Sequence, residues 1–182
     1  MNSQEAPLVW VVMGVAGSGK TLVGRLLAAQ LDCDFLEGDR RHSVANIQKM
    51  AAQTPLTEAD RQQWLGAIAK EIHRAIRDYQ ETVITCSALK QGHRQQLMAS
   101  GRVKLVWLDV PEPELQRRLT QRHHHYMQAR MLESQLAAFE TVKPEESIFT
   151  VDATRHPEDI VAQIWQQAVE HYPSLQQPWW QR

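Results

Sequence analysis

The chain has 182 residues, of which 43% are hydrophobic and 23% are charged, and its formal net charge is −1 at pH 7. This length suits one domain with a sizeable core and is short for two, and the composition is that of an ordinary globular protein. The nearly neutral charge excludes the basic field of a nucleic-acid-binding protein or of a protein that binds anionic membranes, so we expect neither partner.

The same composition limits the cellular location. No apolar run approaches about 18 residues, so we expect no membrane-spanning helix. The segment 1–7 is polar and lacks the basic residues that open a signal peptide. Cys33 and Cys86 form no metal-spaced cluster, and we expect two free thiols in a cytoplasmic protein.

The first predicted element is a buried parallel strand, because residues 8–13 form a continuous apolar run. Residues 14–21 read G-x-x-x-x-G-K-T, and leucines at helical spacing predict a helix over residues 22–31. A strand, a glycine-rich loop and a helix are the context in which this motif binds the phosphates of a nucleotide. Lys20 would reach the β- and γ-phosphates as a catalytic group, and the Thr21 hydroxyl would ligate Mg²⁺. The expected nucleotide-binding residues of the loop are Gly14, Ala16, Gly17, Ser18, Gly19, Lys20 and Thr21.

A short second strand is predicted over residues 34–36, and it ends in Glu37-Gly38-Asp39. Residues two apart on a strand point the same way, so both carboxylates can face the edge of the sheet where the phosphate loop opens. Glu37 would then contact Mg²⁺, and Asp39 would act as general base for a substrate hydroxyl. A solvated turn with a glycine kink is the alternative for this pair taken alone.

The rest of the chain alternates helices and strands. Helices are predicted over residues 44–52, 57–79, 91–99, 112–119 and 157–171, and strands over 82–86, 103–108 and 148–151. The fourth strand ends in Asp109, which either mimics a Walker B carboxylate or shapes the turn before Pro111. Five strands alternating with helices indicate one α/β domain, residues 1–182, with a five-stranded parallel sheet and an irregular tail over 172–182.

Three consecutive histidines, His123–His125, follow the helix at 112–119. Adjacent residues do not converge on one ion, and no cysteine or carboxylate joins them at ligand spacing, so we do not interpret them as a metal site. A polar mobile lid over residues 122–135 fits better, because phosphoryl transfer must exclude water.

Several motifs together resemble one family. Met13–Lys20 is joined to the sequence E-G-D-x-x-H at residues 37–42, and C-S-A-L-K at 86–90 is followed by Arg94. His125-Tyr126 and Ser134-Gln135 continue the match, which covers residues 8 to about 165. In these motifs the chain resembles the gluconokinases, small P-loop kinases related in fold to shikimate kinase and the nucleoside monophosphate kinases.

The resemblance implies ATP-dependent phosphorylation of D-gluconate to 6-phospho-D-gluconate, with Mg²⁺ bound to ATP, by a homodimer. It implies that Asp39 is the base that accepts the proton of the attacking hydroxyl or the group that orients this hydroxyl. It also implies that Arg118 and Arg122 approach the nucleotide, with their division between adenine and phosphate left open. The residues expected to line the sugar-acid pocket are Asp39, His42, Arg61, Lys90 and Arg94.

The chain departs from the family at the substrate loop. Ser43 stands where a proline is usual, and Arg40-Arg41 follow the aspartate. A kinase of a related sugar acid or of a shikimate-like small molecule is therefore an alternative, and a nucleotide-binding module without catalysis is another.

Overall fold

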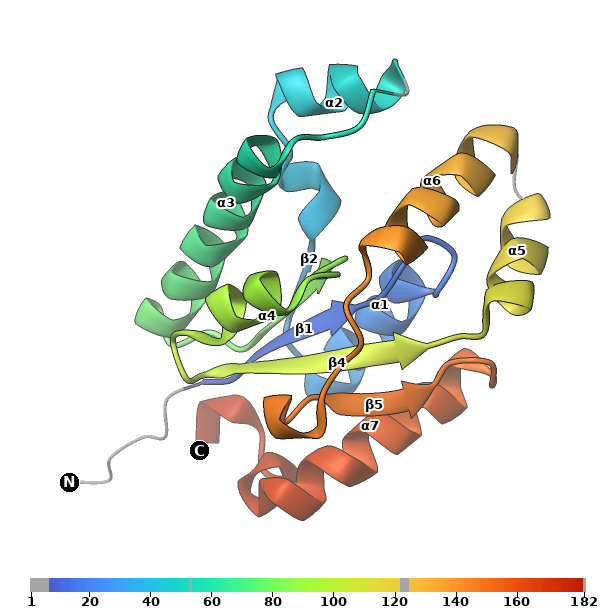
Figure 1. Ribbon diagram of the computed structural model, residues 1–182. Helices are drawn as coiled ribbons and strands as arrows, with labels where there is room; N and C mark the ends of the chain where they lie inside the picture. Colours follow the sequence, from blue (N-terminus) through green and yellow to red (C-terminus); the bar gives the residue numbers. More distant parts are fainter. Residues whose placement is uncertain (1–6, 53, 122–124, 182) are drawn as a thin grey trace.

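The computed structural model describes residues 7–52, 54–121 and 125–181, and it is built around one sheet with helices on both faces (Figure 1). The sheet has five strands, all parallel, in the order β2-β3-β1-β4-β5. This architecture confirms the predicted fold class. The strands are β1 Val9–Met13, β2 Asp34–Glu37, β3 Thr82–Cys86, β4 Val103–Asp109 and β5 Phe149–Asp152.

The helices form the two outer layers. Those of the described residues are α1 Lys20–Leu31, α2 Val44–Ala51, α3 Glu58–Arg77, α4 Gln91–Met98, α5 Glu112–Thr120, α6 His125–Ala138 and α7 Pro157–His171. Short 3-10 turns are η1 Gly38–Arg41, η2 Pro144–Glu146, η3 Pro173–Gln176 and η4 Trp179–Gln181. None of the helices in the described ranges is long and apolar enough to cross a membrane.

The central strand β1 shows why both faces are covered. All five of its residues are fully buried, as the unbroken apolar run predicts for a parallel strand between two helical layers. Trp10 and Val12 pack with α1, α5 and α7, whereas Val9, Val11 and Met13 pack with α3 and α4. Because successive side chains of a strand point to opposite faces, β1 contributes to the hydrophobic core on each side of the sheet.

The strand order brings the candidate site residues to one edge. β1 lies between β3 and β4. The chain passes from β1 to β2 on one side of β1, and after β3 it crosses to β4 on the other side. In open α/β sheets, ligands bind outside the carboxyl ends of the strands at such a switch point. The phosphate loop follows β1, η1 follows β2, and the Ser87–Lys90 segment follows β3.

The structure differs from the sequence-based prediction in the lid region. A helix, α6, occupies His125–Ala138, where the sequence indicated a polar flap. The local sequence lacks a clear apolar stripe, and the buried Leu132 packs into the core shared with α5. Tertiary packing rather than local pattern therefore supports this helix. Arg122, His123 and His124 lie outside the described residues, so the lid over 122–135 stays a prediction.

The C-terminal tail, predicted to be irregular, contains the two turns η3 and η4 and packs on the body. Leu175 is buried, and the Trp179 Nε1–H donates to the Asp32 carbonyl at 2.9 Å.

Candidate active site

The phosphate loop connects β1 to α1 and has the shape of an anion-binding nest. The Ser18 N–H donates to the Val15 carbonyl at 3.2 Å and closes the turn. Gly17 has a φ of 85°, and a Cβ there would lie 3.1 Å from the Leu119 side chain, so both backbone and space require glycine. The loop directs backbone N–H groups and the N-terminus of α1 toward the same point.

Two side chains of the loop support phosphate binding. The Lys20 Nζ lies over the loop and donates to the Val15 carbonyl at 3.0 Å. The Ser18 hydroxyl is buried and has no hydrogen-bond partner among the described residues. A buried hydroxyl without a partner is costly, and a phosphate oxygen in the loop would satisfy it. Thr21 is exposed in the first turn of α1.

Helix α6 reaches the loop through a residue to which the sequence assigned no role. The Ala16 N–H donates to the Gln135 Oε1 at 2.6 Å, across 119 positions of sequence. The amide oxygen of Gln135 therefore accepts a hydrogen bond from an N–H group of the phosphate loop. No spacing or periodicity in the sequence could have paired these residues.

Arg118 lies where the nucleotide was expected. Its guanidinium donates to Glu114 at 2.8 Å, to the Ser18 carbonyl at 3.4 Å and to the Ala153 carbonyl at 2.7 Å. Together with Arg117 it lowers the pKa of Glu114 to about 2, with the Arg117 hydrogen bonds as the largest cause. Arg118 thus bridges the phosphate loop and the segment after β5. Arg122 lies outside the described residues.

The turn after β2 carries Asp39 and is held on two sides. The Thr85 hydroxyl donates to the Glu37 carboxylate, and the Gly38 N–H donates to the Thr85 Oγ1 at 3.2 Å. On the other side, the Trp64 Nε1–H donates to the Gly38 carbonyl at 2.9 Å. A Cβ at Gly38 would lie 1.9 Å from the Thr85 carbonyl oxygen, so only glycine permits this approach.

Cys86 ends β3, between the strands that lead to the phosphate loop and to the Asp39 turn. Burial is the main cause that raises the pKa of Cys86 to about 12, while Asp39 adds to the rise and Lys20 opposes it. Both charges therefore act on the end of β3, which lies between β1 and β2 in the sheet. Since β1 leads to the phosphate loop and β2 to the Asp39 turn, the strand order places these two segments on either side of the end of β3.

His42 follows Asp39 and lies against Trp64. The two rings are stacked, with centroids 4.5 Å apart and planes 12° apart. Burial lowers the pKa of His42, and Asp39 opposes that shift. Trp64 is a buried residue of α3, and its indole contacts both ends of the turn that carries Asp39.

Lys90 and Arg61 lie near the N-terminus of α3, Arg61 within the helix and Lys90 in contact with Glu58. The Lys90 Nζ is 2.8 Å from Glu58, and the buried His93 Nε2 is 3.0 Å from the same carboxylate. These hydrogen bonds, with Lys90 the largest cause, lower the pKa of Glu58 to about 2. Arg61 is half-buried on the next turn of α3, and its guanidinium makes no hydrogen bond to the residues described.

Arg94 has a different environment from the one the sequence led us to expect. Its side chain is fully buried and forms two hydrogen bonds to Glu146, at 2.6 and 2.8 Å. Its other N–H groups donate to the carbonyls of Leu89, Glu140 and Thr141. Because a guanidinium has five N–H donors, all of them are used within the protein. The geometry therefore places Arg94 in the scaffold of the pocket rather than among groups that touch a substrate.

A hollow of about 410 Å³ lies on the flank of α3. Its lining consists of Arg41, Ser43, Gln62, Gln63, Trp64, Gly66, Ala67 and Lys70. Trp64 also stacks on His42, and Arg41 and Ser43 are the sequence neighbours of His42, so the hollow borders the segment around His42. No group of three or more histidine, cysteine, aspartate or glutamate side chains in the described ranges could hold a metal ion by itself.

Comparisons with known proteins agree with this geometry. Residues 9–142 match the AAA domain family. The gluconokinase of Gluconobacter oxydans (strain 621H) is 38% identical over 159 residues, which is 87% of this chain and 89% of that protein. The crystal structure of a gluconokinase from Sinorhizobium meliloti 1021 is 35% identical and superposes with a TM-score of 0.80, over 91% of this chain and 96% of that one.

This chain belongs to the gluconokinase family. A sugar kinase structure from Janibacter sp. HTCC2649, also 35% identical, superposes with a TM-score of 0.84 over 93% of this chain and 98% of that one. The residues 9–142 that match the AAA domain family include the phosphate loop and the Asp39 turn. The chain is accordingly an ATP-using kinase of the P-loop class, as the sequence predicted.

Proposed function

We propose that this protein transfers the γ-phosphoryl group of ATP to the 6-hydroxyl of D-gluconate and releases ADP and 6-phospho-D-gluconate. Membership of the gluconokinase family supports the substrate. The observation that supports the reaction is the strand order, in which β2, leading to Asp39, and β1, leading to the loop of Lys20, are the two neighbours of β3.

The residues divide the chemistry between them. Asp39 would accept the proton of the attacking hydroxyl, and Lys20 would neutralise charge on the transferred phosphoryl group. The cationic Arg61 and Lys90 would bind the carboxylate of the sugar acid, and His42 would bind its hydroxyls. The nucleotide would lie on the phosphate loop beneath Arg118.

The donor set at the loop suits Mg²⁺. Thr21 supplies a hydroxyl and Glu37 a carboxylate, and Mg²⁺ bound to phosphates needs only one or two protein oxygens. Glu37 receives one hydrogen bond from Thr85, which orients it and leaves its second oxygen for the ion or its water shell. When bound with ATP, the ion would neutralise charge on the β- and γ-phosphates.

Two further properties belong to the proposal. A homodimer is supported by the resemblance to the family and is testable by light scattering during gel filtration. A cytoplasmic location is supported by the use of ATP and by Cys33 and Cys86, both of which are free thiols.

The test is a coupled ADP-release assay with Mg-ATP and D-gluconate, compared with other aldonic acids and with shikimate. We expect turnover with gluconate well above the others. Asp39→Asn should lower kcat by about 10²–10⁴-fold and leave the KM for ATP unchanged, because a positioned base contributes about that much. Asp34→Asn, at the other end of β2, is the matched control and should change neither.

Each outcome of this assay is informative. Faster turnover with another acid would refute gluconate as the substrate and retain the kinase. ATP binding without turnover on any acceptor would favour a nucleotide-binding module, and near-normal kcat in Asp39→Asn would refute the role of the aspartate.

A further inference from the structure

His42 is surrounded on three sides by groups that constrain its ring. It follows η1, its Nδ1 lies 3.4 Å from the Asn46 Nδ2 of α2, and its face stacks on Trp64 of α3. Its Nε2 makes no hydrogen bond to any residue in the described ranges. One ring nitrogen is therefore occupied, and the other is left for a ligand.

The orientation of the Asn46 amide decides which ring nitrogen carries the proton. The Asn46 Nδ2 lies 3.1 Å from the backbone carbonyl of Asp60. A carbonyl only accepts hydrogen bonds, so the group facing it must be the NH₂ and not the amide oxygen. Asn46 is 1% exposed, so its amide is not reoriented by water.

The second N–H of that amide points at His42. An NH₂ group only donates, so the facing Nδ1 must be the acceptor and cannot carry a proton. At 3.4 Å this contact is long for a hydrogen bond. A proton on Nδ1 would nevertheless be disfavoured, because it would face the N–H of the amide. The neutral ring then has its proton on Nε2.

Trp64 fixes the plane in which that Nε2–H points. The indole is 4% exposed, and its Nε1–H is tied to the Gly38 carbonyl at 2.9 Å. The stacked imidazole therefore rests on a side chain that does not move independently of the Asp39 turn. The same indole aligns the expected base and the ring of His42.

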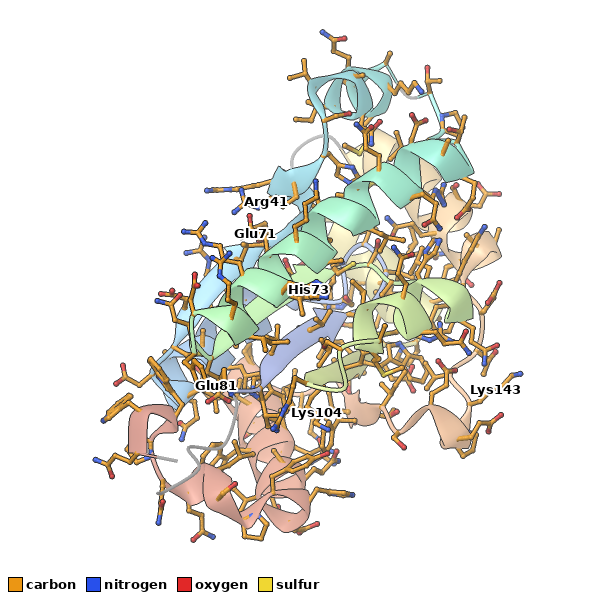
Figure 2. All side chains as sticks on the ribbon, turned by 90° about the vertical axis from the view of Figure 1, so that its left-hand side faces the viewer. Arg41, Glu71, His73, Glu81, Lys104 and Lys143 are labelled. Carbon is orange, nitrogen blue, oxygen red and sulfur yellow. The ribbon has the colours of Figure 1, made fainter. Side chains whose placement is uncertain are left out.

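The surrounding charges leave His42 neutral at physiological pH. On η1, Asp39 favours the charged ring, but burial has the larger effect and lowers the pKa of His42. On α2 and α3, Lys49 pairs with Asp60 at 2.7 Å, so neither charge is free to act on the ring. Figure 2 shows Arg41 beside Glu71 of α3, with which it forms a 3.1 Å ion pair.

We propose that Asn46 and Trp64 are positioning residues that hold His42 as a neutral imidazole protonated on Nε2, so that it donates this N–H to an oxygen of the acceptor substrate. A neutral donor binds a hydroxyl or carboxylate oxygen and leaves the hydroxyl proton for Asp39. The role of the N–H in catalysis rests on the proposed function, whereas the protonation state of the ring does not.

The first measurement is a long-range ¹H–¹⁵N NMR correlation of the whole ¹⁵N-histidine-labelled protein, with His42 assigned by its loss in His42→Gln. We expect the Nε2–H pattern near neutral pH without any substrate. A dominant Nδ1–H tautomer or a charged ring in the wild type would overturn the proposal, whether or not gluconate is phosphorylated.

The second measurement changes the partner of Nδ1. Asn46→Asp places a carboxylate beside the ring and should raise the pKa of His42 by about one unit or more. The apparent pKa of the acid limb, in the pH profile of kcat/KM for gluconate, should rise by the same amount, while the KM for ATP stays constant. Gln48→Glu adds the same charge on an exposed position of α2 and should move neither, so equal shifts in both variants would also overturn the proposal.

Discussion

The buried ion pair of Arg94 and Glu146 allows a quantitative test of the scaffold role. The two side chains are 0% and 3% exposed, and the pair joins α4 to the segment before β5. Glu146→Ala would leave the Arg94 guanidinium buried with its charge uncompensated. If Arg94 instead bound substrate, loss of Glu146 would free it for that task.

The structure sets the size of the expected effect. Removing one partner of a buried, hydrogen-bonded pair costs about 3–5 kcal/mol. The free energy of unfolding of a typical domain is about 5–15 kcal/mol, so this is a large fraction. For a chain of this size about 2–4 °C is lost per kcal/mol, and we expect Glu146→Ala to lower Tm by about 6–20 °C.

The assay is urea unfolding followed by circular dichroism, with kinetics measured where the variant is still folded. Asp78→Ala, which breaks exposed ion pairs with Arg74 and Arg77 at the end of α3, is the control and should leave the urea midpoint almost unchanged. A loss below about 1 kcal/mol in Glu146→Ala, together with a tenfold higher KM for gluconate in Arg94→Lys, would refute the scaffold role.

Three further predictions follow from single contacts. Gln135→Ala frees an N–H of the phosphate loop for ATP, and we expect calorimetry to give about 2–10-fold tighter binding, the range of one neutral hydrogen bond. Gly38→Ala places a Cβ 1.9 Å from a backbone oxygen of β3, so the turn must shift, and we expect a loss of about 1–3 kcal/mol in urea unfolding with a lower kcat. The Glu58 carboxylate has its pKa lowered from 4.5 to about 2, with the Lys90 hydrogen bond as the largest cause. A lowered carboxyl pKa stabilises the folded state above the ordinary value, so the urea midpoint should fall as pH drops from about 4.5 towards 2, and less so in Glu58→Gln.

Each of these predictions has a control. Ser134→Ala, an exposed neighbour in α6, should leave ATP binding unchanged, and weaker binding in Gln135→Ala would contradict the competition between amide and phosphate. Gly66→Ala has open space on α3 and should be neutral or stabilising. If the urea midpoint fell equally with pH in the wild type and in Glu58→Gln, this would contradict the link between the Glu58 pKa and stability.

Local sequence patterns were sufficient for the elements that carry nucleotide chemistry. The apolar run before Gly14, the glycine spacing of the loop and the leucines after Thr21 each act over a few residues, and β1, the loop and α1 form as predicted. The Thr57 cap and its reciprocal bond with Asp60 are similarly local. Such signals are readable because the physical interaction lies within one turn or one strand.

The sequence by itself therefore determined the parallel α/β fold, the nucleotide loop and the family. Only the tertiary structure decided which side chains meet. The contacts of Gln135 with Ala16, of Arg94 with Glu146 and of Trp64 with Gly38 join residues 119, 52 and 26 positions apart. They depend on strand order and on helix packing, for which no local periodicity exists, because burial and hydrogen bonding across elements are properties of the assembled core.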